Sequence, residues 1–442
     1  MSDLPVVVVG AGPVGLAAAA NLVERGLRPL VLEVGSGPGA AVAQWNHVRL
    51  FSDWAELVDP AAARLLEPTG WQRPAAGYPT GSEWVELYLR PLAEALGDAV
   101  RFDTKVVGTA RRGRDRIVDA GRETEPLTVH VVTADGTEER IAASGLIDAS
   151  GTWNSPNPLG GDGLPALGER AAADRITYRV PDLSDAGVVA RYAGKRVAVA
   201  GSGHSALTAL VALTGLPDTK VIWLLRRGAV GDVFGGGDAD QLPARGALGE
   251  RAKQAARDGH VEVVTGFRTT GVERSEDGRL VLVSQDEHRL EPVDEVVVLT
   301  GFRPDLSWLS EIRLDLDPVL QAPKALAPLI DPNAHSCGTV YPHGAAELAQ
   351  PEPGVYLTGM KSYGRAPTFL AMTGYEQVRS VVAKLAGDDE AAARVELTLP
   401  ETGVCGGAGV FDVEVADKPA DSGGCCAPAE PQVLTLSAPS AR

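Results

Sequence analysis

The chain has 442 residues, of which 44% are hydrophobic and 22% are charged. This length suffices for about two or three domains with substantial cores, and the composition excludes disorder along the whole chain. The formal net charge of −17 would repel a phosphate backbone and no dense run of Lys and Arg interrupts it, so nucleic acid is excluded as a main partner.

The apolar start of the chain predicts buried structure and not an export signal. Leu4 to Val9 and Ala17 to Ala20 are apolar, but no basic stretch precedes them and glycines interrupt them before a membrane-spanning length is reached. We therefore expect a strand, a turn and a buried helix here, and no membrane association. Four cysteines in so long a chain are too few for a disulfide framework, which indicates a reducing cytoplasm.

The sequence contains one strand–turn–helix–strand pattern twice, at a distance too long for stacked repeat units. The first copy has strands at 6–9 and 30–33, with the turn Gly10–Gly15 and an Ala-rich helix between them. The second copy has strands at 196–200 and 221–225, with the turn Gly201–Ala206 and a helix between them. This repeat predicts an α/β protein with two Rossmann-like dinucleotide-binding domains.

The segments after each copy are also alike. Short alternating strands joined by Asp135-Gly136 or Asp277-Gly278 predict β-hairpin or meander insertions, and an apolar strand then ends at Gly151 or Gly301. A last strand at 354–359 and a periodic helix at about 368–385 would return the chain to the first domain. The predicted organisation is a first domain at 1–160 and 311–390, a second domain at 161–310 inserted within it, and an extended or disordered tail at 391–442.

The first glycine turn is predicted to bind the pyrophosphate of a dinucleotide. Gly10 permits the tight turn, Gly12 lets the backbone approach a pyrophosphate, and Gly15 lets the helix pack on the strand. The helix N-terminus would supply free N–H groups and a positive dipole end. The turn residues expected at the cofactor are Gly10, Gly12, Pro13, Val14 and Gly15. A tight turn without a ligand is the alternative.

An acidic residue closes the strand that follows this first turn. Glu33 can accept hydrogen bonds from ribose hydroxyls and would repel a 2′-phosphate. The first domain is therefore expected to bind an adenosine ribose that lacks this phosphate, as in FAD or NAD.

The second turn has a different preference. Its residues expected at a cofactor are Gly201, Gly203, His204, Ser205 and Ala206. Ala206 replaces the third glycine, and Arg226 and Arg227 stand where an acidic residue would end the next strand. A guanidinium pair suits a 2′-phosphate, which favours NADPH over NADH; a solvated salt bridge is the alternative role for these arginines. His204 is expected to be a local cap or a cofactor contact and not a general base.

Two dinucleotide sites of unequal preference, the second within the first domain, resemble the two-dinucleotide-binding-domain flavoproteins. This group includes flavin-containing, Baeyer–Villiger and N-hydroxylating monooxygenases and thioredoxin reductases, and the resemblance covers roughly residues 4–390. Asp148–Thr152 and Thr300–Pro304 look like the linkers that join the domains in that group. Within it, Gly201–Ala206, the stretch Gly359–Phe369 and the cysteine-bearing end resemble flavin monooxygenase-like proteins associated with arsenic-resistance gene clusters.

The chain also departs from these relatives. Neither domain contains the Cys-x-x-Cys dithiol of thioredoxin reductases, and the monooxygenase segment with a histidine after a Phe-x-Gly start is not recognisable at 175–182. Gly359-Met360 stands where many relatives have a Gly-Asp that contacts the flavin.

The resemblance implies which segments surround the flavin. The residues expected there are Gln44, Trp45, Gly151, Gly359, Met360, Thr368 and Phe369, in addition to the turn residues. The helix entered at 367–370 would direct N–H groups at the flavin and stabilise negative charge on its reduced form. Core packing is the alternative role for Trp45, Phe51 and Phe369.

Cysteines and histidines near the end of the chain form two further candidate sites. His335, Cys337 and His343 could line a substrate pocket, whereas their spacing matches no specific closed metal site, and a satisfied loop is the alternative. Cys405, Cys425 and Cys426 lie on the tail and could hold a trivalent metalloid through thiolate sulfur or shuttle electrons. Incidental thiols on a disordered tail are the alternative.

These observations leave three functions open. In the first, NADPH reduces FAD and molecular oxygen is used to oxygenate a small soft nucleophile, sulfur or trivalent arsenic. In the second, electrons pass from flavin through Cys425-Cys426 to a disulfide or metalloid. In the third, the protein is a flavin-bound metalloid sensor without activity. The lack of a dithiol in either domain favours the first. No catalytic residue can be named, and a homo-oligomer is compatible with the sequence.

Overall fold

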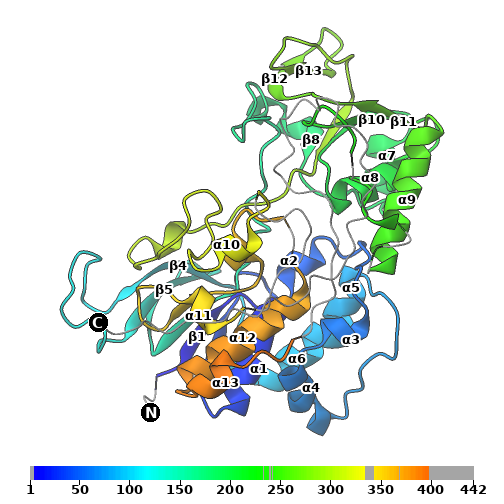
Figure 1. The fold of residues 1–442 in the computed structure, drawn as a ribbon. Helices are drawn as coiled ribbons and strands as arrows, with labels where there is room; N and C mark the ends of the chain where they lie inside the picture. Colours follow the sequence, from blue (N-terminus) through cyan, green and yellow to red (C-terminus); the bar gives the residue numbers. More distant parts are fainter. Residues whose placement is uncertain are drawn as a thin grey trace, which may run out of the picture.

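The computed structural model describes residues 4–231, 233–237, 240, 242–333, 343–367 and 369–397. It contains two α/β domains, one above the other in Figure 1, and the chain passes from the lower domain to the upper one and back. The predicted fold class is confirmed, because each domain is built on a parallel sheet and the second domain interrupts the first in sequence.

The first domain is built on a five-stranded parallel sheet with the order β15-β7-β1-β2-β3. Its strands are β1 (Val6–Val9), β2 (Pro29–Leu32), β3 (Val100–Arg101), β7 (Gly145–Asp148) and β15 (Val355–Leu357). The valines of β1 lie between β2 and β7 and are all buried, which explains a strand that is apolar without alternation. β15 pairs with β7, so the chain rejoins this sheet after the second domain.

The second domain repeats this arrangement in a sheet with the order β11-β10-β9-β14-β8. Its strands are β8 (Ile176–Thr177), β9 (Arg196–Ala200), β10 (Lys220–Leu224), β11 (Val261–Val264) and β14 (Glu295–Val298). β9 lies between β10 and β14 as β1 lies between β2 and β7. The internal repeat therefore corresponds to two copies of one strand order around the glycine turns.

Antiparallel insertions follow each copy, as the Asp-Gly turns predict. β4 (Thr104–Arg111), β5 (Leu127–Thr133) and β6 (Glu138–Ala143) form a three-stranded sheet in the first domain. β12 (Thr269–Arg274) and β13 (Leu280–Ser284) form a hairpin in the second. Gly136 and Gly278 have left-handed φ values of +85° and +80°, which the hairpin turns require.

Helices cover both parallel sheets. Those of the first domain are α1 (Pro13–Glu24), α2 (Ala40–Ala43), α3 (Trp54–Leu57), α4 (Pro60–Leu66), α5 (Gly81–Trp84), the π-helix η2 (Val85–Leu89), α6 (Arg90–Leu96), α10 (Ala327–Ile330), α11 (Ala345–Leu348), α12 (Ala371–Leu385) and α13 (Asp389–Ala393). Those of the second domain are α7 (Ala186–Tyr192), α8 (His204–Leu213) and α9 (Pro243–Arg257). Short 3₁₀ turns are η1 (Glu67–Thr69), η3 (Gly97–Ala99), η4 (Arg170–Arg175), η6 (Ser307–Leu309) and η7 (Gly359–Tyr363).

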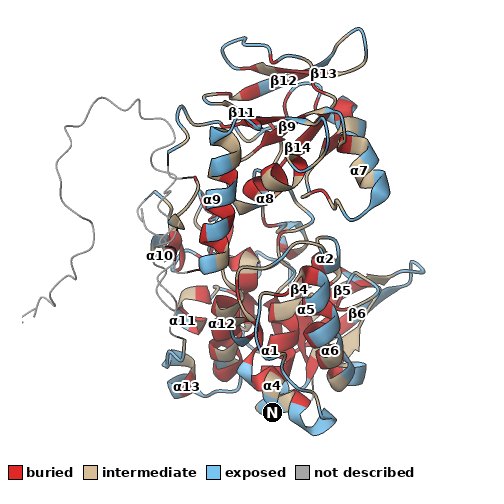
Figure 2. Ribbon diagram, turned by 90° about the vertical axis from the view of Figure 1, so that its right-hand side faces the viewer, coloured by how far each residue is buried: buried red, intermediate tan, exposed pale blue. Residues whose placement is uncertain are grey.

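The core of the first domain lies between α1, α12 and the sheet. Ala17 to Ala20 of α1 are buried, and their small side chains let α12 pack closely. Figure 2 shows buried faces on both helices. The predicted helix at 368–385 begins later than expected, at Ala371, because Leu370 has an extended backbone with φ −110° and ψ 147°. The ring of Phe369 instead packs edge-on against Tyr363, with centroids 4.9 Å apart.

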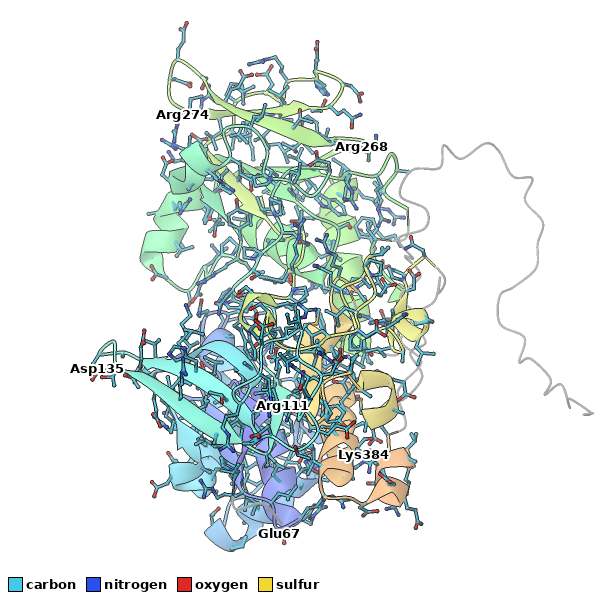
Figure 3. All side chains as sticks on the ribbon, turned by 90° about the vertical axis from the view of Figure 1, so that its left-hand side faces the viewer. Glu67, Arg111, Asp135, Arg268, Arg274 and Lys384 are labelled. Atoms are coloured by element: carbon cyan, nitrogen blue, oxygen red, sulfur yellow. The ribbon has the colours of Figure 1, made fainter. Side chains whose placement is uncertain are left out.

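A buried ion-pair cluster joins the antiparallel insertion to the segment that precedes β15. Glu352 Oε1 lies 2.8 Å from an Arg111 nitrogen and its Oε2 lies 2.6 Å from an Arg122 nitrogen, with the carboxylate fully buried. Figure 3 labels Arg111 at the junction between this insertion and the returning chain. Burial raises the pKa of Glu352, but the hydrogen bonds from Arg122 and Arg111 outweigh burial and leave this pKa below its ordinary value.

A second buried carboxylate caps α4. Asp59 Oδ1 accepts hydrogen bonds from Ala62 N at 2.9 Å and from Asn21 Nδ2 at 3.3 Å, while the Asp59 N–H donates to the Tyr88 hydroxyl. Burial raises the pKa of Asp59 to about 6, against the lowering effect of these hydrogen bonds. The position is therefore structural, and its charge state depends on pH.

Candidate functional site: two dinucleotide-binding turns

The first glycine turn joins β1 to α1 at the carboxyl end of the parallel sheet. Gly10 has a φ of +99°, and a Cβ on it would lie 2.9 Å from the carbonyl oxygen of Ala149. A Cβ on Gly15 would lie 1.9 Å from Gly10 O, so α1 approaches the turn only because Gly15 lacks a side chain. A Cβ on Gly12 would have no neighbouring atom within 4 Å. The backbone at Gly12 thus faces open space, as pyrophosphate binding in such turns requires.

The N-terminus of α1 is left open toward this space. Its N-cap is Gly12, Pro13 opens the first turn, and no side chain caps the helix. Val14 is buried, and the backbone of Gly359 packs against it, since a Cβ on Gly359 would lie 3.4 Å from Val14 Cβ. The structure therefore brings the predicted flavin segment at 359–360 to the first turn of α1.

Glu33 stabilises the conformation of the first glycine turn. Its Oε2 accepts a hydrogen bond from Ala11 N and its Oε1 accepts one from Gly35 N, both at 2.7 Å. Burial raises the pKa of Glu33, while the backbone hydrogen bonds lower it. Each carboxylate oxygen keeps a second lone pair, so a ribose hydroxyl can bind in addition. The carboxylate thus orders the turn itself, a role that the sequence analysis did not predict.

A buried hydrogen-bond network supports the segment after β15. The N–H of Gly359 donates to Gln377 Oε1 at 2.7 Å, and Gln377 Nε2 donates to Ser362 Oγ at 2.9 Å. The same Gln377 nitrogen lies 2.8 Å from His343 Nε2, and His343 is 4% exposed. The amide of Gly359 is therefore already bonded within the protein, and His343 belongs to this network.

Lys361 is buried at the same place. Its Nζ lies 2.7 Å from Asp148 Oδ2, donates to Ser150 Oγ at 3.0 Å and lies 4.9 Å from the centre of the Trp308 ring. Asp148 ends β7 and Trp308 belongs to η6, so this one ammonium group joins the chain leaving the first domain to the chain returning to it. No sequence pattern indicated this ion pair.

The second glycine turn has the same construction. Gly201 has a φ of +133°, and a Cβ on it would lie 2.2 Å from Leu299 O, whereas a Cβ on Gly203 would have nothing within 4 Å. Gly203 is the N-cap of α8, which has no side-chain cap. Ala206 is fully buried in the third glycine's place. Each turn thus packs its first glycine against the residue after the closing strand and leaves its second glycine open.

His204 begins α8, followed by Ser205. Burial, and to a smaller extent the nearby Arg245, lower the pKa of His204 to about 4, so the ring is uncharged at neutral pH. Its ring lies edge-on to Phe51, with centroids 5.4 Å apart. Because Phe51 belongs to the first domain, this contact joins the two domains beside the second turn.

Arg226 and Arg227 follow β10 at the carboxyl edge of the second sheet. β10 pairs in register with β9, so the arginines stand beside the turn that follows β9. Arg226 is exposed and donates to the carbonyl oxygen of Gly161 at 3.2 Å. Arginines at this position would contact the 2′-phosphate of a nucleotide bound at Gly203.

One segment of the first domain runs from the first glycine turn to the second. We call residues 39–51 the bridging segment. It starts where Gly39 N donates to Ala11 O at 2.8 Å and ends at the Phe51–His204 contact. Between these points Gln44 Oε1 accepts a hydrogen bond from Trp153 Nε1 at 3.1 Å. Trp45 is partly buried and packs beside Gly81 against the core of the first domain.

The linker residue Gly151 has a φ of +66° and open space at its Cβ position. Trp153, next in this linker, packs against Phe302 of the return linker, with ring centroids 5.0 Å apart, and Arg179 lies over its ring. The two linkers therefore contact each other between the domains.

Several predicted site residues lie outside the described residues. They are His335, Cys337, Thr368, Cys405, Cys425 and Cys426. Within the described ranges, no group of three or more His, Cys, Asp and Glu side chains could hold a metal ion. No helix in those ranges combines the length and the apolar character needed to cross a membrane.

The residues present fit FAD in the first turn and NADPH in the second. In each turn, no protein atom occupies the place of the missing side chain of Gly12 or Gly203. This space lies beside a helix N-terminus that no side chain caps. A carboxylate follows the first turn and two guanidiniums follow the second, which matches a free ribose and a 2′-phosphate respectively.

Residues 4–319 match the pyridine nucleotide-disulphide oxidoreductase family. The chain belongs to this family. Among curated relatives of this pyridine nucleotide-disulphide oxidoreductase, the ferredoxin–NADP reductase 1 of Cupriavidus necator is 26% identical over 314 residues, which are 70% of this chain and 74% of the relative. The ferredoxin–NADP reductase of Ignicoccus hospitalis is 24% identical over the same length, covering 70% and 81%.

Solved structures show the same fold. The bacillithiol disulfide reductase of Bacillus cereus superposes with a TM-score of 0.65 at 18% identity, covering 87% of this chain and 99% of its own. The flavin-containing monooxygenase of Stenotrophomonas maltophilia does so with a TM-score of 0.54 at 22% identity, covering 88% and 99%. Both cofactor predictions are confirmed, since this is a family of FAD- and NADP(H)-dependent oxidoreductases.

Proposed function

We propose that this oxidoreductase passes electrons from NADPH through FAD directly to an acceptor that reaches the flavin, and that it thereby oxygenates a small soft nucleophile, sulfur or trivalent arsenic. The observation that carries the proposal is the placement of the cysteines. The first 390 residues, which contain both dinucleotide-binding turns, have a single cysteine, Cys337, and the other three are Cys405, Cys425 and Cys426. Those 390 residues therefore contain no pair of cysteines that could relay electrons from the flavin.

We assign the following roles to the residues of the two turns. The Gly10–Gly15 turn and Glu33 would hold FAD, which when bound would supply two-electron redox chemistry between NADPH and the acceptor. The Gly201–Ala206 turn binds the NADPH pyrophosphate, and Arg226 and Arg227 bind its 2′-phosphate by charge-assisted hydrogen bonds. The neutral His204 and the Phe51 ring close the second turn on the side of the first domain and limit the access of water.

Two further observations support oxygenation. The flavin-containing monooxygenase of Stenotrophomonas maltophilia and the ornithine hydroxylase of Pseudomonas aeruginosa share this fold over 88% and 87% of the chain. The stretches at 201–206 and 359–369 and the cysteine-bearing end also resemble flavin monooxygenase-like proteins of arsenic-resistance gene clusters.

The test is the stoichiometry of NADPH, oxygen and product with purified protein. Trivalent arsenicals, thioethers and amines are supplied in turn, and NADPH oxidation, oxygen consumption and product are measured together. An oxygenase consumes one oxygen per product and keeps this activity when Cys425 and Cys426 are replaced by serine. Substrate turnover without proportional oxygen consumption contradicts the proposal.

A reductase is the second candidate, because the curated relatives named above are ferredoxin–NADP reductases. A reductase would reduce its acceptor under argon at the same rate as in air. If it used Cys425 and Cys426, their replacement by serine would abolish that activity. Protein that binds FAD but never oxidises NADPH would favour neither enzyme and would support the sensor alternative.

A further inference from the structure

The bridging segment carries a histidine whose surroundings no cofactor contact explains. His47 lies between Gln44, which bonds to the linker residue Trp153, and Phe51, which contacts His204 of the second turn. A hydride that passes from the second dinucleotide to the first crosses the region between the two turns. His47 therefore lies on the segment that connects the two turns.

The two ring nitrogens of His47 are in different environments. Nδ1 lies 3.7 Å from Oδ2 of Asp182, a residue of the second domain, and the histidine side chain is 19% exposed. Nε2 is buried and has no hydrogen-bond partner among the described residues. A buried polar atom without a partner costs about 1–3 kcal/mol. This nitrogen is therefore available to a bound acceptor.

Asp182 is fixed independently of His47. Its Oδ1 accepts hydrogen bonds from the N–H of Ser184 at 3.0 Å and from its hydroxyl at 2.6 Å. The Ser184 hydroxyl, and to a smaller extent His47, hold the pKa of Asp182 below its ordinary value. The carboxylate is therefore ionised at neutral pH and can orient the imidazole.

The arginines that neighbour His47 and Asp182 in the sequence have other partners. Arg49, on the same segment, donates to Tyr78 O and lies 3.7 Å from Glu83 of α5. Arg179, on the segment of Asp182, lies over the Trp153 ring. Asp182 is thus the carboxylate that faces His47 across the domain boundary.

We propose that His47 donates a proton to the acceptor through Nε2, and that Asp182 is its positioning residue. Every candidate reaction needs one such proton. Reduction of a disulfide follows RSSR + NADPH + H⁺ → 2 RSH + NADP⁺, and oxygenation follows S + O₂ + NADPH + H⁺ → SO + H₂O + NADP⁺. In both, the hydride carries two electrons and one hydrogen, and the second hydrogen comes from solvent. This inference rests on the proposed NADPH and FAD chemistry but not on which acceptor is natural.

The experiment compares acceptors that do and do not take up protons. Protein with bound FAD is reduced with NADPH under argon and mixed in a stopped-flow instrument with menadione, which takes up two electrons and two protons. The same reduced protein is mixed with ferricyanide, which takes up electrons only. His47→Ala should slow the menadione reaction about 100-fold, a typical loss for a general acid, and leave the ferricyanide reaction unchanged.

Two further variants separate proton donation from a structural role. Asp182→Asn should slow the menadione reaction less than His47→Ala and add nothing to it in the double variant, because Asp182 acts through His47. Added imidazole should restore part of the rate in His47→Ala. His130 is the matched control, since its Nε2 also lies 3.7 Å from a carboxylate oxygen, that of Glu138, but on β5; His130→Ala should behave as the wild type.

The outcomes are distinguishable. Equal menadione rates in the wild type and His47→Ala, or equal slowing with both acceptors, overturn the inference. His47→Gln and the unfolding midpoints show whether slowing reflects damage to the fold. A wild type that reduces neither acceptor with NADPH would instead refute the proposed function.

Discussion

The two open glycines allow the cofactor assignment to be tested one turn at a time. Gly12 and Gly203 have φ values of −78° and −85°, which alanine adopts without strain, and a Cβ on either meets no atom within 4 Å. Gly12→Ala and Gly203→Ala should therefore change the free energy of unfolding by less than about 1 kcal/mol. The added methyl group occupies the space of the pyrophosphate and should remove at least one charge-assisted hydrogen bond. That loss is about 1.5–3 kcal/mol, or roughly 10- to 150-fold in affinity.

The assay is a titration of each variant, after removal of its flavin, with FAD and with NADP⁺, read by fluorescence quenching. Gly12→Ala should lose FAD affinity and keep NADP⁺ affinity, and Gly203→Ala should do the reverse, so each variant is the control for the other. Gly15→Ala provides the contrast, because its Cβ would lie 1.9 Å from Gly10 O and should destabilise the fold by about 1–3 kcal/mol. Unchanged FAD binding by Gly12→Ala would refute the reasoning.

Three further results are expected. Arg226→Ala and Arg227→Ala should each raise the KM for NADPH roughly 10- to 100-fold and leave that for NADH unchanged in steady-state assays; equal effects on both coenzymes would exclude a 2′-phosphate contact. Asp59 has a folded pKa of about 6, above the unfolded value of about 3.9, so its contribution to stability is present below about pH 4 and is lost as pH rises to 6, by about 3 kcal/mol. Asp59→Asn keeps an oxygen for the cap, and its thermal midpoint should fall less than that of the wild type between pH 4.5 and 7; parallel curves would contradict this assignment. Glu352→Gln leaves Arg111 and Arg122 buried without a countercharge and should lower the free energy of unfolding in urea by about 3–5 kcal/mol. A change below about 1 kcal/mol would show that the cluster is dispensable.

The parts of the structure that the sequence predicted depend on local signals. Glycine spacing, strand composition and the Asp-Gly pairs each lie within a few residues, so the two turns, the repeated strand–turn–helix–strand pattern and the hairpins could be predicted from the sequence. The predicted start of α12 was wrong by about one helical turn. The apolar periodicity continues through Phe369 and Leu370, whereas the backbone of Leu370 is extended.

The contacts that the sequence did not predict join residues far apart in the chain. Lys361 with Asp148 and His47 with Asp182 are pairs of ordinary surface-type residues, and nothing in the sequence near either residue indicates its partner. The role of Glu33 was predicted only in part. Its place after the strand indicated a ribose contact, but its hydrogen bonds to Ala11 and Gly35 depend on how the turn folds back over β2.

The hydrogen bonds of Glu33 also bear on how the protein acquires its flavin. Since this carboxylate already fixes the loop through main-chain donors of the chain itself, the entropic cost of ordering the loop is met during folding and not during loading. We therefore expect this loop to be ordered before flavin binds, so that flavin binding carries little of that cost.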